Sequence, residues 1–113
     1  VHTVPTSRAI VSLDISDPSR PVEVSRLVFG ELDKPHWIAL EPNGSRIVIS
    51  GGGGTLESRL LIAKVDPRSG KLSLDQSFKE KTSANPGFSF DRESWPHGKN
   101  GRGIPHGAVF SRQ

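Results

Sequence analysis

The chain has 113 residues, a formal net charge of +3 from 15 Lys and Arg against 12 Asp and Glu, and no cysteine. The length fits one small domain, and cations scattered among acids, without an aromatic-rich basic face, argue against nucleic acid as a partner. The lack of cysteine excludes disulfides, thiolate ligands and cysteine nucleophiles. No apolar run approaches the ~20 residues of a membrane helix, so a soluble protein of the cytoplasm or periplasm is expected.

The first two predicted strands follow a short N-terminal segment. Residues 1–8, with Pro5 and several Ser and Thr, are expected to fray. The β-branched run AIVSLDI at 9–15 predicts a strand, and the Asp, Ser and Pro at 16–21 predict a turn. VEVSRLVF at 22–29 alternates apolar and polar residues, which is typical of a strand with one solvated face.

The centre of the chain, residues 34–54, predicts a hairpin. The apolar run at 37–40 suits a strand that is buried on both faces. Pro-Asn-Gly at 42–44 supplies a turn, because Pro presets φ and Asn-Gly tolerates positive φ. RIVIS at 46–50 then returns as a second strand. Four glycines at 51–54 end it, since they indicate a loop or a close backbone approach.

A second pair of strands follows the glycines. RLLIAKV at 59–65 is an apolar run of strand length. The alternating segment at 71–78 is expected to pair with it as the next strand, after a polar turn at 66–70. The segments LDISDPSRPVEV and AKVDPRSGKLSL form a weak internal repeat. Their offset of about fifty residues lies within the range of a propeller blade unit.

Residues 79–103 predict a long polar loop that carries aromatic side chains. A loop of this length inside a compact domain is more often functional than decorative. Three aromatic residues are also more than a flexible linker usually contains. We therefore expect Phe88, Phe90, Trp95 and Arg102 to form a binding loop.

The expected strands predict an all-β fold. They comprise the outer strands of one unit at 9–29, a complete four-stranded unit at 35–78 and an inner strand of the next unit at 104–111. This pattern favours a partial β-propeller with one complete blade and parts of two neighbours. A seven-stranded β-sandwich fits the same strand count and is the alternative. Seven strands do not close a ring of blades and the first residue is Val, so we expect a fragment that needs the rest of its propeller or self-assembly.

Three of the four histidines follow a proline: His36, His97 and His106. Proline stiffens the backbone and keeps the preceding residue extended, which suits the placing of an imidazole at the start of a strand. In a propeller, His36 and His106 would start the inner strands of adjacent blades and face one channel, where imidazoles bind copper or zinc. His97, on the long loop, is a candidate third ligand or general base. The alternative for each is a hydrogen-bonded turn residue.

Four segments carry a resemblance to a known family: LDISDPSRPVEVSRL at 13–27, EPNGSRIVISG at 41–51, KVDPRSGKLSLDQSF at 64–78 and GIPHGAVFS at 103–111. In this order they resemble the C-terminal region of the selenium-binding protein family, which includes the bacterial methanethiol oxidases. The resemblance covers about residues 10–111. The hairpin by itself is also similar to YncE-like and lactonase-like propellers.

The resemblance implies a β-propeller with copper-dependent oxidation of a small thiol, methanethiol, and with metal held by histidines near the channel. Gly107 stands where the family typically has an acidic residue, and the motifs with most of the proposed ligands lie outside this chain. These residues alone are therefore expected to be inactive. Two alternatives stay open: a non-catalytic propeller that binds a protein partner through residues 79–103, and a YncE-like or lactonase-like propeller.

Overall fold

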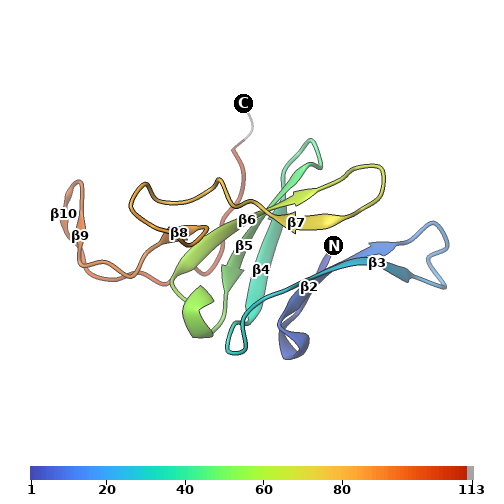
Figure 1. Cartoon of the computed structure of the whole chain (residues 1–113), viewed down its shortest axis with the longest axis horizontal. Coiled ribbons are helices and arrows are strands. Elements are labelled where there is room, and N and C mark those ends of the chain that lie inside the picture. Colours follow the sequence, from blue (N-terminus) through green and yellow to red (C-terminus); the bar gives the residue numbers. More distant parts are fainter. Residues whose placement is uncertain (112–113) are drawn as a thin grey trace.

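The computed structural model describes residues 1–111, which form antiparallel sheets without an α-helix in that range (Figure 1). No helix among these residues is long and apolar enough to cross a membrane. The elements are β1 (His2–Val4), the 3-10 turn η1 (Pro5–Ser7), β2 (Ala9–Asp14), β3 (Val22–Val28), β4 (Pro35–Leu40), β5 (Arg46–Gly51), the 3-10 turn η2 (Gly54–Leu56), β6 (Arg59–Val65), β7 (Leu72–Leu74), β8 (Phe88–Ser89), β9 (Ser94–Trp95) and β10 (Gly98–Lys99).

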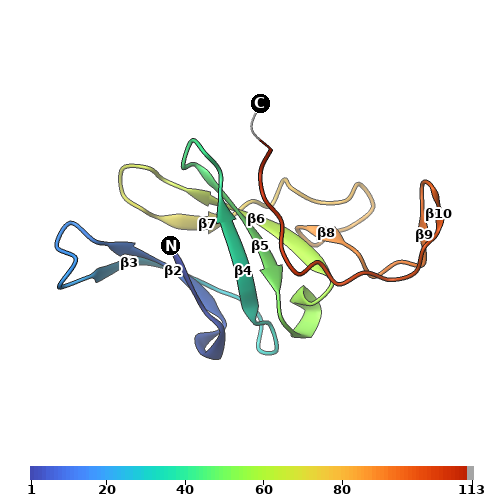
Figure 2. The same ribbon diagram turned by 180° about the vertical axis from the view of Figure 1, so that it is seen from behind.

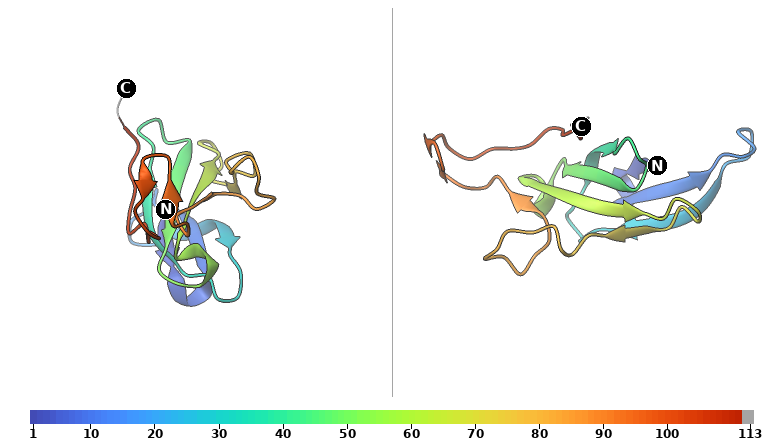
Figure 3. Two further views of the ribbon diagram at one scale, coloured as in Figure 1. Left: turned by 90° about the vertical axis from the view of Figure 1, so that its left-hand side faces the viewer. Right: turned by 90° about the horizontal axis from the view of Figure 1, so that it is seen from above.

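The strands form two main sheets. β1, β2 and β3 make the first sheet in that order, and β4, β5, β6 and β7 make the second, with β8 also paired to β6 (Figure 1). β9 and β10 form a separate hairpin, which Figure 3 shows beyond one end of the sheets. The predicted all-β fold is confirmed, and the arrangement is compatible with either a partial propeller or a β-sandwich.

The N-terminal residues form regular structure, so the expectation that residues 1–8 fray was wrong. β1 pairs with β2 across the turn η1, which a hydrogen bond from Arg8 N to Pro5 O closes at 3.0 Å. Arg8 lies in the left-handed region with φ of 54°. Pro5 begins the turn because its fixed φ matches that of the first position. The proline that indicated disorder is therefore the residue that starts the reversal.

The most buried strand of the second sheet is β5 and not β4. Residues 47–50 are all buried, whereas Trp37 and Leu40 of β4 are 44% and 56% exposed. β4 is the edge of its sheet and has a hydrogen-bonded neighbour on one side only. The prediction that the strand at 37–40 is buried on both faces was therefore wrong, because an apolar run does not by itself distinguish an edge strand from a central one.

One apolar cluster joins the two sheets. Ile10 of β2 is fully buried among side chains of the second sheet and η2, which are Ile47, Ile49, Leu56, Leu61, Ala63 and Leu72. Two hydrogen bonds run between the sheets as well. Ser12 Oγ donates to Gly70 O at 2.6 Å, and Leu72 N donates to Ser25 Oγ at 3.0 Å. The first sheet therefore contributes Ile10 to a core that the second sheet and η2 largely form.

The two sheets repeat one structural unit, in agreement with the internal repeat of the sequence. A 3-10 turn precedes both β2 and β6. Phe29 N donates to Arg8 O at 2.8 Å at the start of β2, and Phe90 N donates to Ser58 O at 2.7 Å at the matching place before β6. The strands therefore correspond in chain order. β1 matches β5, β2 matches β6, and β3 matches the outermost strand of the second sheet.

That outermost strand is divided into two pieces. β3 pairs with β2 along its whole length, whereas β7 pairs with residues 63–65 of β6 and β8 pairs with residues 59–60. Residues 75–87 thus interrupt the edge of the second sheet and then rejoin it. The long loop predicted at 79–103 accordingly contains three short strands rather than only irregular chain.

Residues 104–111, hereafter the tail, are extended but belong to no sheet, so the strand predicted there is not formed within residues 1–111. The tail crosses the second sheet on the face seen in Figure 2. Trp37 Nε1 of β4 donates to Ala108 O at 3.2 Å and holds it there. A strand requires N–H and C=O groups of a neighbouring strand, and none of the described strands forms a ladder with the tail.

Polar contacts close the β4–β5 hairpin. Glu41 N donates to Arg46 O at 2.8 Å, and Arg46 Nε donates to Glu41 Oε2 at 2.9 Å. Ser45 Oγ donates to the same carboxylate at 3.1 Å. The hydrogen bonds from the Arg46 guanidinium, followed by the hydroxyl of Ser45, lower the pKa of Glu41 to about 2. The folded hairpin therefore favours the ionised carboxylate.

This ion pair predicts a pH-dependent part of the stability. The pKa of Glu41 is lowered from 4.5 to about 2 in the folded state. The ionised carboxylate therefore contributes fully to the free energy of unfolding above about pH 4.5, and this contribution is lost as the pH falls toward 2. The difference in unfolding free energy between the native protein and Glu41→Gln should shrink over that window in urea titrations. Arg46→Gln should move the carboxyl pKa of Glu41, measured by NMR, back toward 4.5, and an unchanged pKa would contradict the assignment.

The shared core predicts that Ile10→Ala destabilises the whole chain. Removing a fully buried side chain leaves a cavity between the sheets and should lower the free energy of unfolding by about 2–5 kcal/mol. Ile15→Ala is the matched control, since Ile15 is 65% exposed, and its effect should stay within about 0.5 kcal/mol. Equal effects of the two substitutions in urea denaturation would show that Ile10 does not join the sheets.

Candidate functional site

A β-bulge at the start of β4 redirects His36. Pro35 lies opposite Gly51 and Trp37 opposite Ser50, so His36 has no Cα partner across the ladder. A bulge bends its strand and turns a side chain out of the regular alternation. Pro35 is itself buried, which anchors the backbone directly before the imidazole. The predicted placing of a histidine at the start of this strand is therefore found, with the bulge as its local cause.

A glycine lets the His36 side chain lie against the neighbouring backbone. A Cβ on Gly52 would lie 3.1 Å from His36 Cβ and 3.3 Å from Cγ, closer than most side chains tolerate. Gly52 N also donates to Lys34 O at 2.8 Å, which fixes this approach. The close backbone approach predicted for the glycines at 51–54 is thus located beside the histidine.

The tail brings His106 to the same place. A Cβ on Gly107 would lie 3.1 Å from the Trp37 ring, so glycine allows the tail to pass directly over the indole. Further along, the Arg46 guanidinium lies 5.3 Å from the centroid of the Phe110 ring, a cation–π distance. Together with the hydrogen bond from Trp37, these contacts fix the tail on β4 and β5.

The result is a pair of imidazoles from segments that are far apart in the sequence. The ring centroids of His36 and His106 are 5.4 Å apart and the rings are tilted by 41°. Both residues are exposed, so the pair is open to a ligand from solvent. Among residues 1–111 no group of three or more His, Cys, Asp and Glu side chains could hold a metal ion. We refer to His36 and His106 as the imidazole pair.

His97 lies elsewhere. It occupies the turn of the hairpin between β9 and β10 and is exposed. Figures 1 and 2 show this hairpin at one end of the molecule, away from β4. The structure therefore brings together two of the three histidines proposed as ligands and does not bring the third to them.

The aromatic residues of the predicted binding loop pack on one another. Phe88 and Phe90 meet edge to face at 5.6 Å, and Phe90 lies 5.4 Å from Trp95. The Arg92 guanidinium carbon lies 4.6 Å from the centroid of the Phe88 ring and 5.1 Å from the centroid of the Trp95 ring. The same guanidinium forms an ion pair with Glu80. These rings are half-buried. We call these five residues the aromatic cluster, and its main role in this geometry is to hold residues 79–103 together.

Arg102, the fourth residue of the predicted binding loop, lines a separate groove. It pairs with Asp91 at 3.2 Å. The groove has a volume of about 870 Å³ and lies between the end of β3, η2, the start of β6 and the long loop. Its floor includes Phe29 and Leu61, and its charged walls carry both signs, with Asp33, Glu57, Asp91, Arg59 and Arg102. This mixture of charges does not select one class of ligand.

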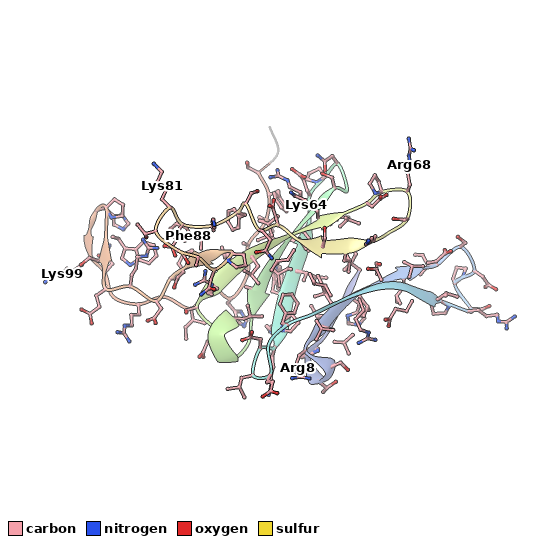
Figure 4. All side chains as sticks on the ribbon, viewed as in Figure 1. Arg8, Lys64, Arg68, Lys81, Phe88 and Lys99 are labelled. Carbon is pink, nitrogen blue, oxygen red and sulfur yellow. The ribbon has the colours of Figure 1, made fainter. Side chains whose placement is uncertain are left out.

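The basic side chains do not gather into one patch on the labelled elements. Figure 4 shows Arg8, Arg68, Lys81 and Lys99 on separate parts of the molecule. Lys64 pairs with Asp75 at 3.3 Å. This distribution agrees with the scattered charge pattern of the sequence.

Comparison of the chain with protein-family models, with curated proteins and with solved structures found no match. The function proposed below therefore rests on the geometry of the imidazole pair and on the resemblance of the sequence segments.

Three residues have roles in these sites that the sequence did not assign to them. Gly52 and Gly107 make room for the histidine and the tail, and Glu80 neutralises the arginine of the aromatic cluster. The glycine run at 51–54 did indicate a close backbone approach, and Gly52 lies in that run, but its neighbour His36 was not predicted. No local pattern connects Glu80 with Arg92, since they meet only through the fold of the loop.

Trp37→Phe should release the tail and separate the imidazole pair. The substitution keeps an aromatic ring but removes the Nε1 donor to Ala108 O, a bond worth about 0.5–1.5 kcal/mol net. The NOE between the ring protons of His36 and His106 should weaken. Trp95→Phe is the matched control, because it removes an equivalent bond to Gly101 O in the long loop and should leave the NOE intact. An undiminished NOE in Trp37→Phe would show that other contacts hold the tail.

Proposed function

We propose that this chain is part of a metal-dependent β-propeller oxidoreductase of the methanethiol oxidase type, and that the imidazole pair supplies two ligands of its copper centre. The observation that carries the proposal is the 5.4 Å approach of His36 and His106. Both follow a proline, and they belong to segments at opposite sides of the long loop. The resemblance to the selenium-binding protein family supports copper and a small thiol as the chemistry.

The donor set fits copper in type. Imidazole nitrogens are preferred ligands of copper and zinc, and the chain has no cysteine to compete. Metal–nitrogen bonds of about 2 Å allow two rings at this separation to share one ion. The pair provides fewer ligands than a complete site needs, so the remaining positions would be filled by residues beyond those described or by water.

The surroundings of the pair suit a site near an inner channel. Trp37 lies against Gly107 beside the histidines and gives the site one apolar wall. Copper, when bound, would supply the one-electron chemistry that oxidation of a thiol requires. The residues of this chain would bind the ion and hold the two rings at their separation, and Trp37 would exclude water from one side.

The stacking of the sheets supports a propeller over a sandwich. The first sheet covers the face of the second that carries Ile47 and Ile49. Val48 and Ile62, on the opposite face, are also buried, and the tail crosses the second sheet on this side (Figure 2). A two-layer sandwich leaves its outer faces solvated, whereas each propeller blade is covered on both faces.

The alternatives have less support from the geometry. A propeller that binds a protein through residues 79–103 would need exposed aromatic side chains, but Phe88, Phe90 and Trp95 are engaged in the aromatic cluster. A lactonase-like hydrolase would need acidic residues beside the histidines. Among residues 1–111 no carboxylate joins the imidazole pair in a metal-binding group.

Copper titration of the chain tests the proposal. We expect Cu²⁺ to bind and to broaden the ring-proton NMR signals of His36 and His106 together. His36→Ala and His106→Ala should each weaken binding at least about tenfold, the effect expected for losing a ligand. His97→Ala is the control and should bind as the native chain does.

The proposal fails if His36→Ala and His106→Ala bind Cu²⁺ as tightly as the native chain. It also fails if His97→Ala has the same effect as they do, because binding would then follow the number of histidines and not the pair. Oxidation of methanethiol is measured with the longer protein that contains these residues, once binding by the pair is established.

A further inference from the structure

We propose that the hydroxyl of Ser50 is the hydrogen-bond partner that orients the His36 ring when the imidazole pair binds its metal ion. In this role Ser50 is a positioning residue, because it touches the ring of a ligand and not the ion. The role rests on the proposed function and deepens it. Its basis is a buried hydroxyl without a hydrogen bond, on the face of the sheet where the bulge places His36.

Ser50 has a buried side chain whose hydrogen-bonding capacity is unused. The residue is 1% exposed, and its Oγ forms no hydrogen bond to any described residue. Ser12 is buried as well, but its Oγ donates to Gly70 O at 2.6 Å. A buried polar group without a partner has given up its bonds to water and gained none, so such groups are rare and call for an explanation. Ser50 therefore has a hydrogen bond still to make.

The Ser50 side chain lies on the face of the second sheet that the tail crosses (Figure 2). Alternate residues of a strand point to opposite faces. Ile49 belongs to the apolar core, and a Cβ on Gly51 would collide with Leu56 of the same core. Both neighbours of Ser50 in β5 thus face the core. Ser50 faces the other way, as does Gly52.

The bulge in β4 places His36 next to Ser50. Trp37 lies opposite Ser50 in the ladder, and His36 is the extra residue directly before it. His36 Cβ lies 3.1 Å from the position of a Cβ on Gly52, which is on the same face as Ser50. Side chains at opposite and diagonal positions of an antiparallel pair are close enough to interact. The imidazole and the hydroxyl therefore occupy neighbouring positions on one face.

The other neighbours of Ser50 on this face do not supply a partner. Trp37 and Leu60 lie opposite Ser50 on the two adjoining strands. The leucine side chain is apolar, and Trp37 Nε1 already donates to Ala108 O at 3.2 Å. His36, at the next position, brings a ring N–H that a hydroxyl oxygen can accept.

A rotation of the His36 side chain would bring the ring to the hydroxyl. In this structure the ring lies beside Gly52, where the lack of a side chain leaves it room. His36 is exposed, so its ring is free to turn about its side-chain bonds. Histidines that bind a metal through one nitrogen usually donate the other ring N–H to an oxygen, which fixes the tautomer and the ring direction. Ser50 supplies such an oxygen.

A partner from outside residues 1–111 is a less direct explanation for this hydroxyl. Ser50 belongs to β5, which lies between β4 and β6 in its sheet. At 1% exposure its side chain is already enclosed. Another segment would have to displace what covers Ser50, whereas His36 is beside it on the adjoining strand.

Titration of the full chain with Zn²⁺ tests the proposal. Zinc is used because imidazoles bind it as they bind copper and because it leaves NMR signals sharp. Ser50→Ala should weaken Zn²⁺ binding at least about tenfold, the effect of removing the hydrogen-bond partner of a ligand. Ser12→Ala is the matched control, because it removes a buried hydroxyl that already has a partner. It should bind Zn²⁺ as the native chain does.

NMR of the His36 ring gives a measurement that a purely structural role of Ser50 would leave unchanged. With Zn²⁺ bound to the native chain, the ring N–H of His36 should exchange slowly with water, because a buried oxygen accepts it. In Ser50→Ala at saturating Zn²⁺ the same proton should exchange faster. In Ser12→Ala its exchange should match that of the native chain.

The two serine substitutions should change the stability of the chain in opposite directions when no metal is added. Ser50→Ala removes a buried hydroxyl without a partner, so it should raise the midpoint of urea unfolding. Ser12→Ala breaks a hydrogen bond between the two sheets, so it should lower the midpoint.

Three results would overturn the role of Ser50. The first is Zn²⁺ binding by Ser50→Ala that is as tight as that of the native chain. The second is unchanged exchange of the His36 ring proton in Ser50→Ala, because another group would then accept it. The third is a lowered urea midpoint in Ser50→Ala, which would show that the hydroxyl already has a partner in the fold.

The role of Ser50 and the proposed function fail in different ways. If His36→Ala and His106→Ala weaken metal binding and Ser50→Ala does not, the imidazole pair keeps its function and only the role of Ser50 is wrong. A native chain that binds neither Cu²⁺ nor Zn²⁺ overturns both.

Discussion

The burial of Ile10 against the second sheet is the contact on which the rest of the structure depends. Each sheet is one layer of short strands, and a single layer cannot bury an apolar face by itself. The hydrogen bonds from Ser12 to Gly70 and from Leu72 to Ser25 hold the layers in one alignment. That alignment leaves the other face of β4 free for the tail. The position of the imidazole pair thus follows from packing in a core that contains neither histidine.

The imidazole pair itself is produced by departures from regular strand structure. A regular β4 would direct the side chain of residue 36 to one face of its sheet, but the bulge after Pro35 redirects it. Gly52 and Gly107 supply space where a Cβ would collide with a neighbour. Irregularities of this kind weaken a sheet, and they are common where a side chain must be aimed away from the regular alternation.

Sequence patterns predicted the parts of the fold that depend on neighbours in the chain. The alternation at 22–29, the Pro-Asn-Gly turn and the apolar run at 59–65 all formed strands or turns at those positions. The errors concern properties set by distant residues. Whether 37–40 is a central or an edge strand depends on what lies beside β4, and whether the tail is a strand depends on a partner. The Pro-His pattern predicted that His36 and His106 face one place, and the fold brings their rings to 5.4 Å, although only His36 lies in a strand. Only the fold could exclude His97 from their neighbourhood.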